Sequence, residues 1–234
     1  MQQKPDAPEC SMRDWLNWLV RIALTSKGDL INPSTRPQPL NREQTARLVS
    51  RLVQRGFAKF TEIEVGIRDE QVSSLTAEDE RWLQTEIRRQ LKDKRREEND
   101  WPEETSWDRL NKVFKSLRRS GIIALHNAGF DESDGLTLVD EAREASTSRP
   151  FKGFCFYHQQ DVDAALDYNS LSLSYGAFDP SPEAMQWVPR LILTKSREAG
   201  FAAEWSGNYA ERIVLAGFVW QKRSPRSTSA RQSF

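Results

Sequence analysis

The chain has 234 residues, of which 38% are hydrophobic and 29% are charged, and it carries eight tryptophans and eleven phenylalanines. This composition is sufficient to build a hydrophobic core and excludes a globally disordered chain. Lysine plus arginine balances aspartate plus glutamate at 34 each, which argues against a strongly basic nucleic-acid-binding protein.

The sequence carries no signal of export or membrane insertion. Its first ten residues are polar and lack the apolar core of a signal peptide. Its apolar stretches are far shorter than the roughly 20 residues that a membrane span needs. Two cysteines, Cys10 and Cys155, do not make a disulfide framework in a chain of this length. We therefore expect a cytoplasmic protein with reduced thiols and no membrane contact.

The N-terminal part of the chain carries helical patterns. Residues 11–26 place apolar side chains at spacings of three and four, which predicts an amphipathic helix: Trp15, Trp18, Leu19 and Ile22. Residues 41–56 begin with a capping asparagine and end with a glycine, which predicts a second helix. Residues 57–67 fit either a short strand or the start of another helix. A further, highly charged helix is predicted within 76–98, so we expect residues 1–100 to form a helical N-terminal region.

The charged helix contains the run RRQLKDKRR. Acidic residues interspersed with this run weaken its attraction for phosphate, and ion pairs along a solvent-exposed helix account for the pattern. Residues 224–234 are basic and rich in serine, and we expect them to form a disordered tail. A nucleic-acid-associated regulator that uses this helix and tail is an alternative, but we do not expect nucleic acid to be the partner.

A proline-containing break at residues 99–106 precedes a region, residues 101–223, in which helices and strands alternate. Helices are predicted at 106–121 with Ser106 as N-cap, at 135–146, at 160–167 and after Ser181. Strands are predicted at 122–125, 153–158 and 171–178. A hairpin is predicted at 201–205 and 212–220. Pro189 is expected to kink or restart the last helix. This order predicts an α+β fold, with a helical N-terminal region and a C-terminal α/β-type domain built on a mixed sheet of about five strands.

The two histidines of the chain, His126 and His158, each end a predicted strand. The connection between them contains a helix and is long enough for a crossover between parallel strands. If the strands are parallel neighbours, both histidines emerge at the same edge of the sheet, where ligands of α/β sheets bind. Polar residues of the neighbouring segments complete the predicted binding site: Asn127, Asp134, Tyr157, Gln160, Asp161 and Glu204.

Several chemistries suit this site. A histidine with a carboxylate can act as general acid and base, and two histidines with a carboxylate can ligate a metal. The same residues can instead cap helices and satisfy backbone groups where strands end. Recognised motifs for nucleotide binding, serine hydrolysis or zinc-dependent proteolysis are absent from the sequence, so no metal and no cofactor are assigned.

We therefore expect first a binding or protein-interaction module with a polar cleft at the strand ends and a protein or small molecule as its partner. The second expectation is a small enzyme, such as a hydrolase, that uses His126 and His158 with a nearby carboxylate.

The C-terminal part of the sequence resembles a bacterial family known only as a domain of unknown function, number 6891. The resemblance covers about residues 100–223 and rests on these motifs: WPEETSWDRLNKVFKSLRRSGIIALHNAG, DG, CFYHQQD, LSLSYGAF, AEWSG and RIVLAGFVWQKR. It implies an α+β domain in a bacterial cytoplasmic protein and no particular activity. Some relatives hold cysteines after the first strand, which suggests metal binding in them. This chain has HNAGFDESDG there, without cysteine, so the resemblance implies no metal site in it.

Overall fold

The computed structural model describes residues 40–70, 75–146 and 150–225. The amphipathic helix predicted at residues 11–26 and the end of the predicted tail, residues 226–234, lie outside the described residues. None of the helices in the described residues is long and apolar enough to cross a membrane.

Helices and a mixed sheet make up the described part of the chain, which confirms the α+β fold. The elements, in chain order, are α2 (Arg42–Arg55), α3 (Phe60–Glu70), α4 (Ala77–Glu97), α5 (Ser106–Arg119), β1 (Ile122–Leu125), α6 (Glu132–Glu144), β2 (Gly153–Phe156), α7 (Gln159–Tyr168), β3 (Ser170–Ala177), α8 (Pro182–Glu198), β4 (Ala202–Glu204) and β5 (Ile213–Ala216).

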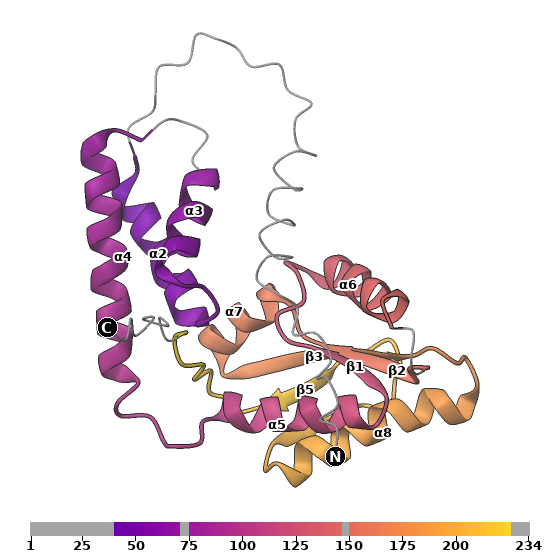
Figure 1. Cartoon of the computed structure of the whole chain (residues 1–234). Coiled ribbons are helices and arrows are strands. Elements are labelled where there is room, and N and C mark those ends of the chain that lie inside the picture. The colour runs from indigo at the N-terminus through magenta and orange to yellow at the C-terminus, as the bar shows by residue number, and fades with distance from the viewer. Residues whose placement is uncertain (1–39, 71–74, 147–149, 226–234) are drawn as a thin grey trace, which may run out of the picture.

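Helices α2, α3 and α4 pack side by side as a helical layer (Figure 1). The segment for which the sequence left two alternatives is helical: Ile63 and Ile67, four residues apart on α3, are both buried. They share a core with Val49 of α2 and with an apolar stripe of α4 that includes Leu83 and Ile87. The helical period of these apolar residues therefore packs α3 against its two neighbours.

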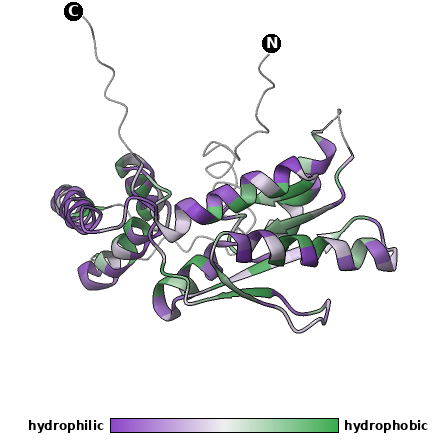
Figure 2. Ribbon diagram, turned by 90° about the horizontal axis from the view of Figure 1, so that it is seen from below, coloured by the Kyte–Doolittle hydropathy of each residue, from purple (hydrophilic) through white to green (hydrophobic). Residues whose placement is uncertain are grey.

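The five-stranded sheet has the order β1-β2-β3-β5-β4, with β1 parallel to β2 and the other neighbours antiparallel. The mixed sheet and the predicted hairpin, β4 with β5, are thus confirmed. Helices α5 and α8 lie along one face of the sheet and α6 lies on the other (Figure 1). The strands are mostly hydrophobic, whereas α4 is mostly hydrophilic (Figure 2), as expected for a covered sheet beside a solvent-exposed helix.

Strand alternation divides the side chains of β1 and β2 between two cores. Ala124 and Tyr157 belong to the core shared with α5 and α8, whereas Ile123 and Phe156 belong to the core under α6. Successive side chains of a strand point to opposite faces. This rule decides on which face each residue after a strand emerges.

Two helix details differ from the sequence prediction. Ser106 as N-cap is wrong: Thr105 is the N-cap of α5, because only Thr105 has an aspartate, Asp108, at the third helical position to complete a reciprocal capping box. At Pro189 the sequence predicts a kink or a restart; the restart does not occur, because α8 continues through this buried proline. The proline removes one backbone donor, the one that would reach Met185, and the packing of the helix on the sheet tolerates this loss.

The helical layer contacts the α+β part through side chains of α2 and α7. Arg55 donates two hydrogen bonds to Asp163, at 2.8 and 2.6 Å, and Arg51 donates to Asp167. The C-terminal segment adds a third contact, because Trp220 Nε1 donates to the backbone oxygen of Arg55 at 3.1 Å. Polar contacts therefore connect the two parts of the chain.

Candidate functional site

The two histidines follow the carboxyl ends of parallel neighbouring strands, but their rings lie on opposite faces of the sheet. His126 continues the face of Ala124 and contacts Tyr157, and its ring stacks on Phe114 at 4.4 Å. His158 continues the face of Phe156 and contacts Asp161. The structure thus places the two rings in separate surroundings rather than in one shared pocket.

The chain around Asn127 extends the pairing of β1 with β2. Ala128 N–H donates to the backbone oxygen of Tyr157 at 2.8 Å, and Gln159 N–H donates to the backbone oxygen of Gly129 at 3.0 Å. Asn127 has a φ of 50°, in the left-handed region that asparagine tolerates better than most residues. The segment after β1 therefore runs alongside the start of α7, and the entries of α6 and α7 lie at one edge of the sheet.

His126 belongs to a buried aromatic network. Trp107 Nε1 donates to Tyr157 Oη at 3.3 Å, and Tyr157 Oη lies 2.9 Å from His126 Nδ1. Burial lowers the pKa of His126 well below its usual range, so the ring is neutral and Nδ1 can accept a hydrogen bond from the Tyr157 hydroxyl. The other ring nitrogen, Nε2, is buried and has no hydrogen-bond partner among the described residues. This network fills the core between α5 and the sheet.

His158 is held in a charged group on the other face. It is the N-cap of α7 and is 4% exposed. Its Nε2 lies 3.2 Å from Asp161 Oδ2, and Arg212 fixes the same carboxylate through two hydrogen bonds of 2.8 and 2.7 Å. Burial lowers the pKa of His158 although Asp161 favours the charged ring. The Nδ1 atom is buried and has no hydrogen-bond partner among the described residues.

Two further polar residues lie on this face. Ser174 Oγ donates to the Oε1 atom of Glu132, the first residue of α6, at 3.1 Å. Ser174 pairs with Phe156 of β2. Because Leu173 pairs with Ile213 in antiparallel strands, Ser174 also lies next to Arg212. We call His158, Asp161, Arg212, Glu132 and Ser174 the His158 cluster. Its residues come from the starts of α6 and α7, from β3 and from the residue before β5.

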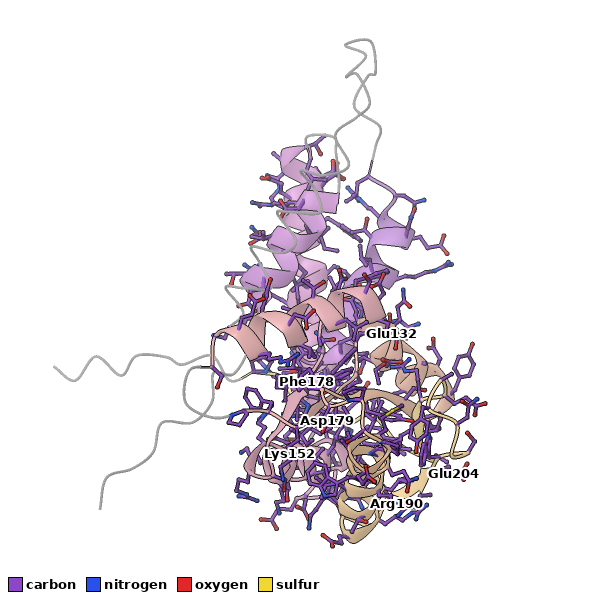
Figure 3. All side chains as sticks on the ribbon, turned by 90° about the vertical axis from the view of Figure 1, so that its right-hand side faces the viewer. Glu132, Lys152, Phe178, Asp179, Arg190 and Glu204 are labelled. Atoms are coloured by element: carbon purple, nitrogen blue, oxygen red, sulfur yellow. The ribbon has the colours of Figure 1, made fainter. Side chains whose placement is uncertain are left out.

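The remaining predicted site residues have other positions. Asp134 caps α6 by accepting backbone N–H bonds from Phe130 and Asp131. The side chain of Gln160 makes no hydrogen bond within the described residues, and the residue is exposed. Glu204 lies on β4, which β3 and β5 separate from β2, and it lies apart from Glu132 (Figure 3).

The sequence prediction included His158 and Asp161 but missed Arg212, Glu132 and Ser174. Glu132 carried a weak signal as the residue after a capping aspartate. Ser174 carried another, because the alternation LSLSY predicts that its serines share one face. The pairing of Arg212 with Asp161 spans 51 positions and had no local signal. No three His, Cys, Asp or Glu side chains are grouped to hold a metal ion in residues 40–70, 75–146 and 150–225.

These features define an α+β protein with a mixed five-stranded sheet, a helical layer and a polar cluster at the starts of two helices. A family model described as "Domain of unknown function (DUF6891)" matches residues 38–224, and the chain belongs to this family. The match includes α2, α3 and α4 and so extends beyond the region that the sequence motifs cover. No curated protein and no solved structure matches the chain.

Proposed function

We propose that the chain is a binding module and that the His158 cluster is its ligand site. The observation that supports this proposal is the state of the His158 ring. Its Nε2 lies 3.2 Å from Asp161 Oδ2, a carboxylate that Arg212 holds through two hydrogen bonds, while Nδ1 is buried without a partner among the described residues. Buried polar atoms normally have hydrogen-bond partners. A neutral ring with a donor at Nε2 leaves Nδ1 as an acceptor for a ligand N–H or O–H group.

The charges around the ring favour a ligand that carries a cationic N–H group, such as a primary amine. Asp161, Glu132 and Asp131 all act on His158 to favour its charged form, and Arg212 is the cation opposing them. The Arg212 guanidinium is engaged by Asp161. Glu132 is exposed, so its carboxylate is accessible at the rim of the cluster and can attract an ammonium group.

A small enzyme is the second candidate, and one feature of the cluster favours it. A neutral imidazole oriented by a carboxylate is the arrangement of a general base, and His158 with Asp161 has this arrangement. The base would act in hydrolysis by taking a proton from water at Nδ1. His126 lies on the other face of the sheet and takes no part in this candidate reaction.

The nucleic-acid alternative gains no such support. The α4 cations Arg89 and Arg96 form ion pairs with acidic residues of the same helix, Glu86 and Asp93. These pairs reduce the positive charge that α4 presents to a phosphate backbone.

Nitrogen NMR of protein labelled at histidine tests the binding proposal, because the chain has two histidines and thus two imidazole spectra. A set of small primary amines and their neutral N-acetyl forms is titrated into the full chain. We expect an amine to shift His158 Nδ1 and to leave His126 unchanged. Glu132→Gln should weaken this response, whereas Glu141→Gln, an exposed change on the same helix, should not. The proposal fails if no amine shifts His158, or if the N-acetyl forms shift it equally.

A further inference from the structure

A second candidate site lies in the helical layer and is built from other elements than the His158 cluster. A cavity of about 210 Å³ lies between the start of α3, the face of α4 and the C-terminal segment. An apolar cavity of about 150 Å³ is large enough to hold benzene. The space is therefore sufficient for a single aromatic ring with one small substituent.

The walls of the cavity are largely apolar. Ala58 and Leu91 are buried, Phe60 is half-buried, and Pro225 closes the side formed by the C-terminal segment. Arg88 lies over the Phe60 ring, 5.1 Å from its centroid. These side chains offer a hydrophobic surface to a ligand body, with little polar surface to orient it.

The polar groups of the cavity are cationic or uncharged. Lys59 and Arg95 line it, and neither forms an ion pair with another described residue, in contrast to Arg89 and Arg96 on the same helix as Arg95. The hydroxyl oxygen of Ser224, which also lines the cavity, is buried and has no hydrogen-bond partner among the described residues.

Phe60 and Thr61, in the first turn of α3, line the cavity, so the positive end of this helix dipole lies beside it. The nearby acids are already engaged with backbone groups. Glu62 accepts the N–H of Lys59 at 2.6 Å, and Glu98 accepts the N–H of Ser224 at 2.7 Å. Neither carboxylate lines the cavity.

We propose that this cavity binds a small organic carboxylate with an apolar body of about one aromatic ring. The ring occupies the space between Phe60 and Leu91, and the carboxylate lies between Lys59 and Arg95 within reach of the Ser224 hydroxyl. The charge complementarity is specific to an anion, because the cavity has two cations without ion-pair partners among the described residues and no acidic side chain in its described lining. This site is independent of the His158 cluster and of the function proposed for it.

Fluorine NMR with para-fluorobenzoate tests this inference, and para-fluorobenzamide serves as its uncharged counterpart of nearly equal size. On addition of the full chain we expect the benzoate signal to broaden and shift and the benzamide signal to stay unchanged. Arg95→Gln and Lys59→Gln should each weaken benzoate binding by about tenfold or more, because each removes a charged hydrogen-bond donor. Arg81→Gln, which changes an exposed residue on the same helix as Arg95, should leave benzoate binding unchanged.

Three results would overturn the inference: no response to the benzoate, an equal response to the benzamide, or an Arg95→Gln chain that binds like Arg81→Gln. All three substituted side chains belong to exposed residues, so the variants should fold. Circular dichroism and a thermal melt of each variant verify this before the titration.

Discussion

The two histidines are neutral because burial disfavours their charged forms. Desolvation lowers the pKa of both below the ordinary value of 6.5. The two imidazoles are therefore protonated at a higher pH in the unfolded chain than in the folded chain. As a result, the free energy of unfolding decreases as the pH falls below 6.5. Each neutral histidine contributes at most about 1.4 kcal/mol of this loss per pH unit.

Substitution of His126 should remove part of this acid sensitivity. We expect the free energy of unfolding of the unmodified chain to fall between pH 6.5 and pH 5, and that of His126→Gln to fall less steeply, with a lower value at pH 7 because the Tyr157 network is disturbed. Urea denaturation at the two pH values measures both. Parallel pH dependences for the two chains would contradict the neutral state assigned to His126.

Lys94 is a buried lysine whose charge costs stability. Its Nζ donates to the Val53 oxygen at 2.8 Å at the end of α2, and burial lowers its pKa from 10.5 to about 8. Because the unfolded chain binds this proton more tightly, the cost is fully present below pH 8 and disappears as the pH rises towards 10.5. The pKa difference corresponds to about 3 kcal/mol.

The stability of the unmodified chain should therefore rise relative to that of Lys94→Met between pH 8 and pH 10. The substitution removes the titrating group, and with it this dependence on pH. Lys92→Met, an exposed change on α4, should keep the dependence. Denaturant unfolding of the three chains at both pH values gives the comparison, and a constant difference between the unmodified chain and Lys94→Met would contradict the lowered pKa.

At the scale of elements, the two edge strands share one protective arrangement. Arg118 donates to the Ala124 oxygen in β1 at 2.9 Å, and Arg197 donates to the Ala203 oxygen in β4 at 3.1 and 2.8 Å. The segments RRSGIIA and REAGFAA place arginine, glycine and alanine at the same spacing. An edge strand exposes backbone groups that can pair with another chain, and each arginine occupies one of them.

Arg197→Ala should lower the free energy of unfolding by about 1 kcal/mol, since it removes hydrogen bonds from a charged donor. It should also increase self-association, because the edge of β4 is less protected. Arg190→Ala changes an exposed arginine on the same helix and serves as the control. Urea denaturation and sedimentation velocity report the two effects. An Arg197→Ala chain as stable and as monodisperse as the control would show that the contact protects nothing.

Local signals predicted most elements, whereas long-range contacts decided the candidate site. Capping residues and apolar periods located α2 and α4, the apolar period located α5, and the crossover length correctly suggested that β1 and β2 are parallel. The sequence prediction placed both histidines in one pocket because it did not consider that side chains alternate between the two faces of a strand. His126 follows Leu125 directly and lies on one face of the sheet. His158 lies two positions after Phe156 and is on the other face. The partner of Asp161 is Arg212, 51 positions away, and spacing along the chain cannot identify such a contact.

At the scale of the whole molecule, one buried arginine connects the helical layer to the α+β part. Arg55 is 9% exposed and forms its ion pair with Asp163. Removal of the carboxylate leaves a buried charge without its partner, so Asp163→Asn should lower the free energy of unfolding by about 2 kcal/mol.

Asp167→Asn is the matched control on the same helix. Its partner Arg51 is 36% exposed in its side chain, so solvent can replace the lost contact and the change should cost less than about 1 kcal/mol. Urea denaturation of both variants measures the difference. Equal effects would mean that Arg55 contributes no more to the contact between the two parts than a surface arginine does.

The position of α6 above the sheet depends on a glycine in its first turn, Gly135. A β-carbon at Gly135 would lie 2.2 Å from the Phe156 ring, closer than any stable carbon contact. A methyl group there would force the first turn of α6 outward, and the carboxylate of Glu132 would lose its reach to the Ser174 hydroxyl. The distance between the acidic rim and the imidazole beneath it is thus set by one glycine that has no chemical role of its own.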